Sequence, residues 1–173
     1  MQQRVAPRQE ILRPAGWGVV YFSLAAALAI NLLPWQGTAL LLRPDFVALA
    51  VLYWCVYQPR SIGFGMAWGL GLLMDAADGA LLGQHALAYG AITFAGMILQ
   101  RRILMFGMGQ QMLHALPVLL GGQGIVLLVA LASDGTFPGW GWFSGSLIGA
   151  ALWPPLVAIL RMPQRPRRDP DQA

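Results

Sequence analysis

The sequence lacks lysine, has a single cysteine and carries very little charge. Of its 173 residues, 57% are hydrophobic and only 10% are charged. A soluble fold has too little interior to hide so much apolar surface. The composition therefore excludes an ordinary soluble domain and indicates an integral membrane protein. The charged residues between Trp17 and Leu160 are Arg43, Asp45, Arg60, Asp75, Asp78, Arg101, Arg102 and Asp134.

The scarcity of cysteine, histidine and facing carboxylates excludes most kinds of site chemistry. Cys55 has no second cysteine to pair with, and we expect it to be a small buried apolar residue. His85 and His114 have no metal-ligating neighbours at suitable spacing, so we expect neither a metal ion nor a cofactor. An intramembrane aspartyl protease needs two carboxylates that face each other. Asp75 and Asp78 instead lie three residues apart at the end of one helix. We therefore expect a protein without enzyme activity.

Six apolar segments have, or approach, the roughly 20 residues that a helix needs to cross a bilayer. They predict an all-α, polytopic integral membrane protein whose six transmembrane helices form one compact bundle. Ala27-Leu28-Ala29 resembles a signal-peptide cleavage triplet, but the apolar run continues to Leu33, so we expect the first span to be retained. The predicted spans are Gly16–Leu33, Pro44–Gln58, Ser61–Ala76, Ala80–Gln100, Gln110–Ala132 and Pro138–Leu160.

Arginine is distributed unevenly about these spans. With six crossings, one side of the membrane receives Arg43 together with Asp45, Asp78 and Asp134. Because positively charged loops are retained in the cytoplasm, the opposite side is cytoplasmic and holds both termini. The arginines on that side are Arg4, Arg8, Arg13, Arg60, Arg101, Arg102, Arg161, Arg165, Arg167 and Arg168.

This distribution divides the chain into three parts. Residues 1–15 are predicted to form a basic cytoplasmic arm, and residues 16–160 the transmembrane domain. Residues 161–173 are Pro-rich and charged, which predicts a disordered cytoplasmic tail. Since the basic residues stand beside membrane spans, we expect them to attract anionic lipid and not nucleic acid.

Unusual polar residues are concentrated between the second span and the start of the fourth. Asp45 stands in a first helical turn, where the helix dipole favours a carboxylate. Asp75 stands where its helix should still be in or near hydrocarbon, so it needs a partner, and Arg43 is the expected one. We predict a polar cavity or partner site at the outer mouth of the bundle; a solvated loop and a buried structural tie are the alternatives. Its residues are Arg43, Asp45, Asp75, Asp78 and Gln84.

Glycines recur at spacings that allow helices to approach closely. A glycine at every fourth position leaves one smooth helix face, as in the third and sixth predicted spans. A further pair of glycines brackets the expected turn between the third and fourth spans. The predicted helix-packing and turn positions are Gly65, Gly69, Gly71, Gly79, Gly83, Gly141, Gly145 and Gly149.

An ordered series of short motifs in the first half of the chain resembles a known family. The motifs and their order resemble those of the MreD family of rod shape-determining membrane proteins. The length of the chain and its basic ends are also similar to those of that family. That family in turn is similar in fold to the substrate-binding subunits of energy-coupling-factor vitamin transporters. The motifs are Leu42-Arg43-Pro44-Asp45, Tyr53-Trp54, Gln58-Pro59, Trp68-Gly69-Leu70-Gly71 before Asp75, and Gly79 followed by Gly83-Gln84-His85-Ala86-Leu87.

The resemblance implies a non-enzymatic scaffold in the bacterial inner membrane. Such a scaffold would belong to the cell-elongation complex and organise lateral peptidoglycan synthesis, with MreC, MreB and the peptidoglycan polymerase and transpeptidase as partners. The alternative is the substrate-binding membrane subunit of a small-molecule, vitamin-type transporter. Ala25 and Ala29 form the small-residue pair that would meet a transport partner. A retained small ligand would favour the transporter, and co-purification with MreC the scaffold.

Overall fold

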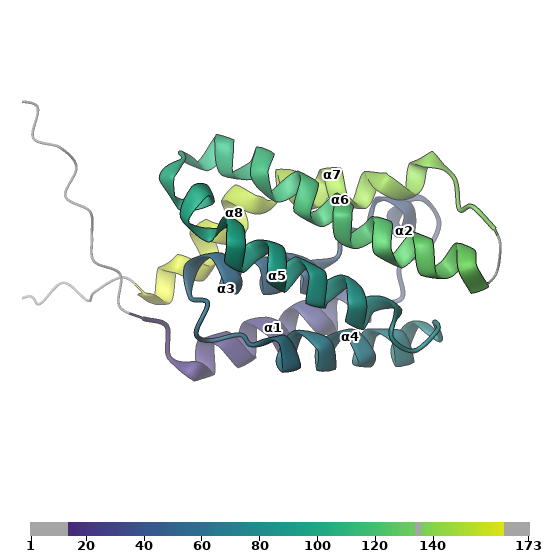
Figure 1. Cartoon of the computed structure of the whole chain (residues 1–173), viewed down its shortest axis with the longest axis horizontal. Helices are drawn as coiled ribbons and strands as arrows, with labels where there is room; N and C mark the ends of the chain where they lie inside the picture. Colours follow the sequence, from purple (N-terminus) through teal and green to yellow (C-terminus); the bar gives the residue numbers. More distant parts are fainter. Residues whose placement is uncertain (1–13, 134–135, 165–173) are drawn as a thin grey trace, which may run out of the picture.

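The computed structural model of the chain describes residues 14–133 and 136–164, and every element within those ranges is a helix (Figure 1). The all-α prediction is therefore confirmed for this part of the chain. The elements are α1 (Trp17–Asn31), α2 (Thr38–Leu42), α3 (Phe46–Tyr57), α4 (Phe64–Asp78), α5 (Gln84–Met105), α6 (Met108–Ser133), the 3-10 helix η1 (Trp140–Phe143), α7 (Ser144–Ala151), α8 (Trp153–Arg161) and the 3-10 helix η2 (Met162–Gln164).

Parts of the predicted organisation lie outside the described ranges. They are residues 1–13 of the basic arm, Asp134, and residues 165–173 of the tail. The described beginning of the tail differs from the prediction, because the helical bundle continues as far as Gln164. The Gln164 side chain is buried, and its Nε2 donates a hydrogen bond to the Tyr53 hydroxyl at 3.1 Å. This contact holds the chain against the bundle beyond residue 161.

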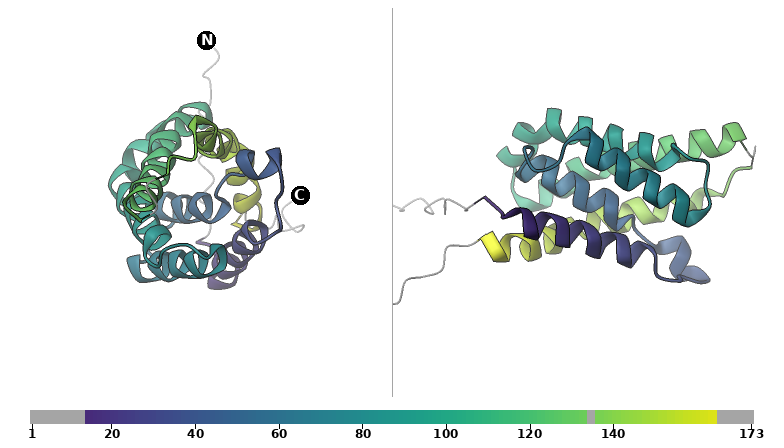
Figure 2. Two further views of the ribbon diagram at one scale, coloured as in Figure 1. Left: turned by 90° about the vertical axis from the view of Figure 1, so that its right-hand side faces the viewer. Right: turned by 90° about the horizontal axis from the view of Figure 1, so that it is seen from below.

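α3 lies at the centre of the bundle (Figure 2). Every residue from Val47 to Val56 is at most 3% exposed, and α1, α5 and α6 pack against the helix. The segment has no charged residue, and its large polar aromatics have hydrogen-bond partners: Trp54 donates its indole N–H to Ser23 Oγ at 2.9 Å. A helix that is apolar on all sides needs apolar surroundings, either protein or lipid, and for α3 these are supplied by the neighbouring helices.

Helix length limits which elements can cross a membrane unaided. α6 is long and apolar enough, and the bent pair of η1–α7 with α8–η2 would make a second crossing if it counts as one element. α1 and α3 are apolar but shorter. The 12 residues of α3 extend about 18 Å, which is less than the ~30 Å hydrocarbon core. Six membrane crossings therefore stay a prediction.

A tight glycine turn joins α4 to α5. Gly79 ends α4 at φ +62° and Gly83 precedes α5 at φ +103°, in the left-handed region that residues with a Cβ atom rarely adopt. The two helices also approach closely, because a Cβ atom on Gly71 would lie 2.3 Å from the backbone Cα of Ala86. The turn and the close approach together place the end of α4 beside the first turn of α5.

The sixth predicted span is not one smooth helix. α7 and α8 are bent by 41° relative to each other. Pro154 and Pro155 stand at the start of α8, and since proline has no backbone N–H, they cannot bond to the preceding turn. The expected glycine face of Gly141, Gly145 and Gly149 is also not on one α-helix, because Gly141 lies in η1 while Gly145 and Gly149 lie in α7.

The two ends of the bundle differ in character. α1 begins and η2 ends at the same end of the bundle, where α3 and α5 also end (Figure 2). This end, termed the arginine end, carries Arg60, Arg101, Arg102 and Arg161. The opposite end, termed the polar-site end, holds α2 and the first turns of α3, α5 and α7 (Figure 1).

Candidate functional site

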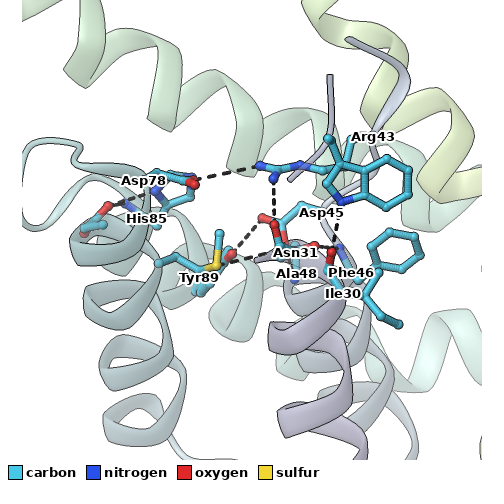
Figure 3. A network of polar contacts seen from close by, with 12 residues as sticks. Ile30, Asn31, Arg43, Asp45, Phe46, Ala48, Asp78, His85 and Tyr89 are labelled. Carbon is cyan, nitrogen blue, oxygen red and sulfur yellow. Dashed lines mark hydrogen bonds and ion pairs between the residues drawn. The ribbon is translucent and has the colours of Figure 1, made fainter. Parts of the chain in front are cut away.

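Asp45 is the centre of a polar network at the polar-site end (Figure 3). It caps α3 by accepting a hydrogen bond from the backbone N–H of Ala48 at 2.9 Å. Its carboxylate also accepts from Nδ2 of Asn31 at 2.9 Å and from the Tyr89 hydroxyl at 2.8 Å. Asn31 ends α1, and its Oδ1 in turn accepts from the backbone N–H of Phe46 at 3.0 Å. Asp45 therefore ties α1, α3 and α5 together, with each partner satisfying one oxygen lone pair.

Arg43 lies at the edge of this network. Its Nη1 donates to the backbone carbonyl of Asn31 at 2.7 Å, one of the last carbonyls of α1 that have no helical partner. Its Nη2 lies 3.9 Å from Oδ2 of Asp78, and the two side chains are 20% and 32% exposed. A long, partly exposed ion pair of this kind contributes little to stability. The guanidinium is thus held mainly by the Asn31 carbonyl.

Asp75 and His85 form a second cluster in the same region. Asp75 is fully buried, and its carboxylate accepts hydrogen bonds from the backbone N–H groups of Gly83 and His85, both at 2.8 Å. Nδ1 of His85 lies 2.8 Å from the same carboxylate. Because a carboxylate oxygen can only accept here, Nδ1 carries the proton and donates it. The cluster fixes the turn between α4 and α5 from inside.

The expected pairing of Arg43 with Asp75 does not occur. Arg43 pairs with Asp78, and Asp75 is satisfied by His85 and two backbone N–H groups. The glycine turn explains the difference, since it brings three donors to Asp75 before any cation from another segment is needed. Asp78 lies one turn further along α4, where the carboxylate faces outward.

A cavity of about 330 Å³ lies beside the first turn of α3. Its polar lining comes from five helices or their flanks, and its apolar lining includes Leu49, Ile92, Leu119 and Val126. On the α6 and α7 side, Gln123 donates from Nε2 to the Trp142 carbonyl at 2.6 Å and accepts a hydrogen bond from Ser146 Oγ. A cavity of this size, with an apolar wall and a few converging polar groups, is suited to binding a small ligand. The polar lining residues are Asn31, Arg43, Asp45, His85, Tyr89, Gln123 and Ser146.

The predicted polar residues are only partly united at this cavity. Arg43 and Asp45 line it, whereas Asp75 and Asp78 do not; Asp75 contacts the lining residue His85, and Asp78 contacts Arg43. Gln84 is buried as the first residue of α5 and does not line the cavity. The cavity-lining polar residues that lie within apolar helices were not predicted from the sequence. Each is a single polar side chain in an apolar segment, and this feature could have identified it. They are Asn31, Tyr89, Gln123 and Ser146.

The predicted glycines occupy three different settings. A Cβ atom on Gly71 or Gly145 would meet backbone within 2.6 Å, and one on Gly149 would make ordinary contact with the side chains of Leu119 and Leu49 and with Pro44. Gly79 and Gly83 form the turn described above. The remaining three have no described atom within 4 Å of the position of a Cβ atom, so they do not pack against another described helix. These are Gly65, Gly69 and Gly141.

The fold and the site define a class: an all-helical protein with at least one helix long and apolar enough to cross a membrane, whose central helix is capped by a buried polar network beside a small cavity. The chain belongs to the MreD family, because residues 13–163 match the family described as rod shape-determining protein MreD. It is also 27% identical over 153 residues to the rod shape-determining protein MreD of Haemophilus influenzae, an alignment that covers 86% of this chain and 92% of that protein. No solved structure matches the chain. Family membership supports a role in determining rod shape.

Proposed function

We propose that this protein is a non-enzymatic scaffold of the cell-elongation complex in the bacterial inner membrane. In this role it organises lateral peptidoglycan synthesis together with MreC, MreB and the peptidoglycan polymerase and transpeptidase. The observation that carries the proposal is the family match, which extends over all described helices except the last residue of η2. A shape-determining role needs partner surfaces and no reaction centre.

The proposed arrangement places the arginine end in the cytoplasm and the polar-site end outside, with six membrane crossings. The described arginines support it, because all except Arg43 lie at one end. The short α3 is compatible with a membrane setting, since protein and not lipid surrounds it. The cytoplasmic arm and tail proposed at the two ends of the chain would then both meet the cytoplasmic leaflet.

The exposed face of α4 around Gly65 and Gly69 is the first surface to test for contact with a partner helix. Gly65 and Gly69 have open space above them, and the neighbouring Phe64, Trp68 and Leu73 are each about half exposed. In a bilayer, a small-residue notch between bulky side chains allows close packing of another transmembrane helix. A bulky residue in the notch removes that packing without touching the interior of the bundle.

The scaffold proposal is tested by replacing glycines in matched positions in a rod-shaped host that depends on this protein. Gly69→Leu should leave membrane accumulation normal but weaken co-purification with MreC and widen the cells. Gly124→Leu is the control, because Gly124 of α6 also has no described atom within 4 Å of its Cβ position. Normal cell width after a clean deletion of the chain would contradict the proposal.

The cavity supports a second candidate, the substrate-binding subunit of a small-molecule transporter. Its volume and mixed lining are those of a ligand pocket inside a helical bundle. The two functions are separated by a clean deletion: loss of rod shape supports the scaffold, whereas unchanged cell width with loss of uptake of one vitamin supports the transporter.

A further inference from the structure

The cavity exists because the central helix is short. α3 has 12 residues, whereas its neighbours α5 and α6 have 22 and 26. At 1.5 Å per residue, the neighbours extend roughly 15–20 Å further than α3. The space left beside the first turn of α3 is covered by α2 and α7, whose Leu40 and Gly145 line the cavity.

The cavity wall changes from polar to apolar along the bundle axis. α3, α5 and α7 all begin at the polar-site end, and on α3 and α5 the polar lining residue precedes the apolar one by about a turn. Asp45 precedes Leu49, and Tyr89 precedes Ile92. On the oppositely directed α6, Leu119 also lies below Gln123, while Val126 lies above it, so the gradient is clearest on α3 and α5. An occupant that matches this wall has a polar head at the polar-site end and an apolar part below it.

The two buried carboxylates of the site have little capacity left for a ligand. Asp45 accepts three hydrogen bonds, from Asn31, Ala48 and Tyr89, and Asp75 accepts three from Gly83 and His85. Asp45 lines the cavity with most of its acceptor capacity already used, and Asp75 does not line it.

Arg43 and His85 retain free capacity. Arg43 uses one N–H on the Asn31 carbonyl and holds Asp78 only at 3.9 Å. His85 donates from Nδ1 to Asp75, which leaves Nε2 as an acceptor with no hydrogen-bond partner among the described residues. Both side chains line the cavity. The site thus presents a cationic donor and a neutral acceptor.

The local charge selects between candidate head groups. The polar site contains three carboxylates, those of Asp45, Asp75 and Asp78, and among the described residues of the site one guanidinium, that of Arg43. A second anion would be repelled by this excess of negative charge, whereas a head group with both a phosphate and an ammonium adds no net charge. Its phosphate suits Arg43, and one of its N–H donors suits Nε2 of His85.

We propose that the cavity binds the head group of a zwitterionic phospholipid that carries N–H donors, of the phosphatidylethanolamine class. The phosphate contacts Arg43, the ammonium donates to His85, and the upper part of one acyl chain lies against Leu49, Ile92 and Leu119. This inference rests on the membrane embedding of the bundle and not on the scaffold role, so a failed complex assay leaves it standing.

Native mass spectrometry of the full chain tests this lipid preference. The purified protein is released from nanodiscs that contain equal amounts of phosphatidylethanolamine, phosphatidylglycerol and phosphatidylcholine. We expect selective retention of one phosphatidylethanolamine molecule. Phosphatidylcholine has the same charge but no N–H donor, and phosphatidylglycerol has hydroxyl donors but a net negative charge. Equal retention of the three lipids, or preference for either of the other two, would overturn the proposal.

Variants assign the retained lipid to this cavity. Arg43→Gln removes the cation, and His85→Asn keeps a donor for Asp75 while removing the acceptor towards the cavity. Each should lower phosphatidylethanolamine retention about tenfold, as the loss of one charge-assisted hydrogen bond predicts. Arg60→Gln at the arginine end is the control and should retain the lipid like the unaltered chain. Unchanged retention in folded Arg43→Gln and His85→Asn would show that the lipid binds elsewhere.

A volume-filling variant tests the cavity independently of charge. Ala88 lines the wall and is 1% exposed, so Ala88→Leu should exclude the lipid while leaving Arg43 and His85 in place. A variant without a thermal unfolding transition is not folded and cannot be interpreted. In that case the lipid preference of the unaltered chain still tests the proposal. Retention of a small soluble molecule in place of lipid would overturn the proposal and favour the transporter reading. Glycerophosphoethanolamine, the soluble head group without acyl chains, should bind much more weakly than the lipid.

Discussion

Nδ1 of His85 lies 2.8 Å from Oδ1 of Asp75 and joins the first turn of α5 to the last turns of α4. The same carboxylate accepts two backbone hydrogen bonds from the turn that follows α4. Because Asp75 is fully buried, water could not take its place as the acceptor for these three donors. The pair therefore acts as an internal clamp on the wall that carries the polar site.

Asp75→Asn should destabilise the protein markedly. An asparagine offers one acceptor oxygen in place of two, and its NH₂ group would face a donor, so at least one buried N–H loses its partner. Such a loss costs about 1–3 kcal/mol. The shift is measured as the change in thermal unfolding temperature in detergent. Asp78→Asn is the matched control on the same helix, and its partly exposed ion pair predicts a change of at most about 1 kcal/mol. Equal shifts for the two variants would contradict the assignment of the clamp to Asp75.

Double-mutant cycles should couple Arg43 to Asp78 and not to Asp75. The Arg43→Gln and Asp78→Asn changes should be non-additive by a few tenths of a kcal/mol, as expected for a weak pair 3.9 Å apart. Arg43→Gln combined with Asp75→Asn should be close to additive, because no contact joins the two side chains. The unfolding temperatures of the four-member cycles give both coupling values. Stronger coupling to Asp75 would restore the pairing that the sequence suggested.

Two glycines of α4 should respond in opposite ways to alanine. A Cβ atom on Gly71 would lie 2.3 Å from the backbone of Ala86, so Gly71→Ala must separate α4 from α5 and should cost roughly 1–3 kcal/mol or more. Gly69 has open space, so Gly69→Ala should be neutral or stabilise the helix by up to about 1 kcal/mol. Expression level and unfolding temperature measure both effects. A tolerant Gly71 would mean that the two helices are further apart.

Thiol labelling in intact cells should report the proposed orientation. Ser133 is exposed at the end of α6, at the polar-site end, so Ser133→Cys should react with a membrane-impermeant reagent. Gly107 is exposed between α5 and α6, at the arginine end, so Gly107→Cys should react only after the cells are permeabilised. The native Cys55 is fully buried and provides an unreactive background. The reverse labelling pattern would invert the topology.

The sequence could predict the helical segments because apolar runs and breakers are local signals. Each of the six predicted runs between Gly16 and Leu160 overlaps a helix, and the glycine turn at Gly79 and Gly83 was visible in the spacing. What composition cannot reveal is which helix lies in the centre. α3 and α6 are both strongly apolar, but α3 is enclosed by protein, whereas about two thirds of the apolar window in α6 is not buried.

The polar site was predicted in region but not in pairing. Arg43 and Asp45 could be found as charges in an apolar chain, but the partner of each charge depends on three-dimensional geometry. Asp75 is satisfied within ten residues of itself, so the long-range cation was unnecessary. Tyr89 contributes through one hydroxyl, 44 residues from Asp45, and no sequence period marks that distance.

Because α3 is enclosed on all sides, it cannot reach its final surroundings until later helices have been synthesised. The ribosome produces α1 and α3 first, while α5 and α6, which cover much of α3, follow about 30 to 80 residues later. During that interval the apolar sides of α3 must be sheltered by lipid or by the insertion machinery. Asp45 must likewise wait for Tyr89 before its second oxygen is satisfied. The assembly of the polar site is therefore a late event in biogenesis, completed only after more than half of the chain has entered the membrane.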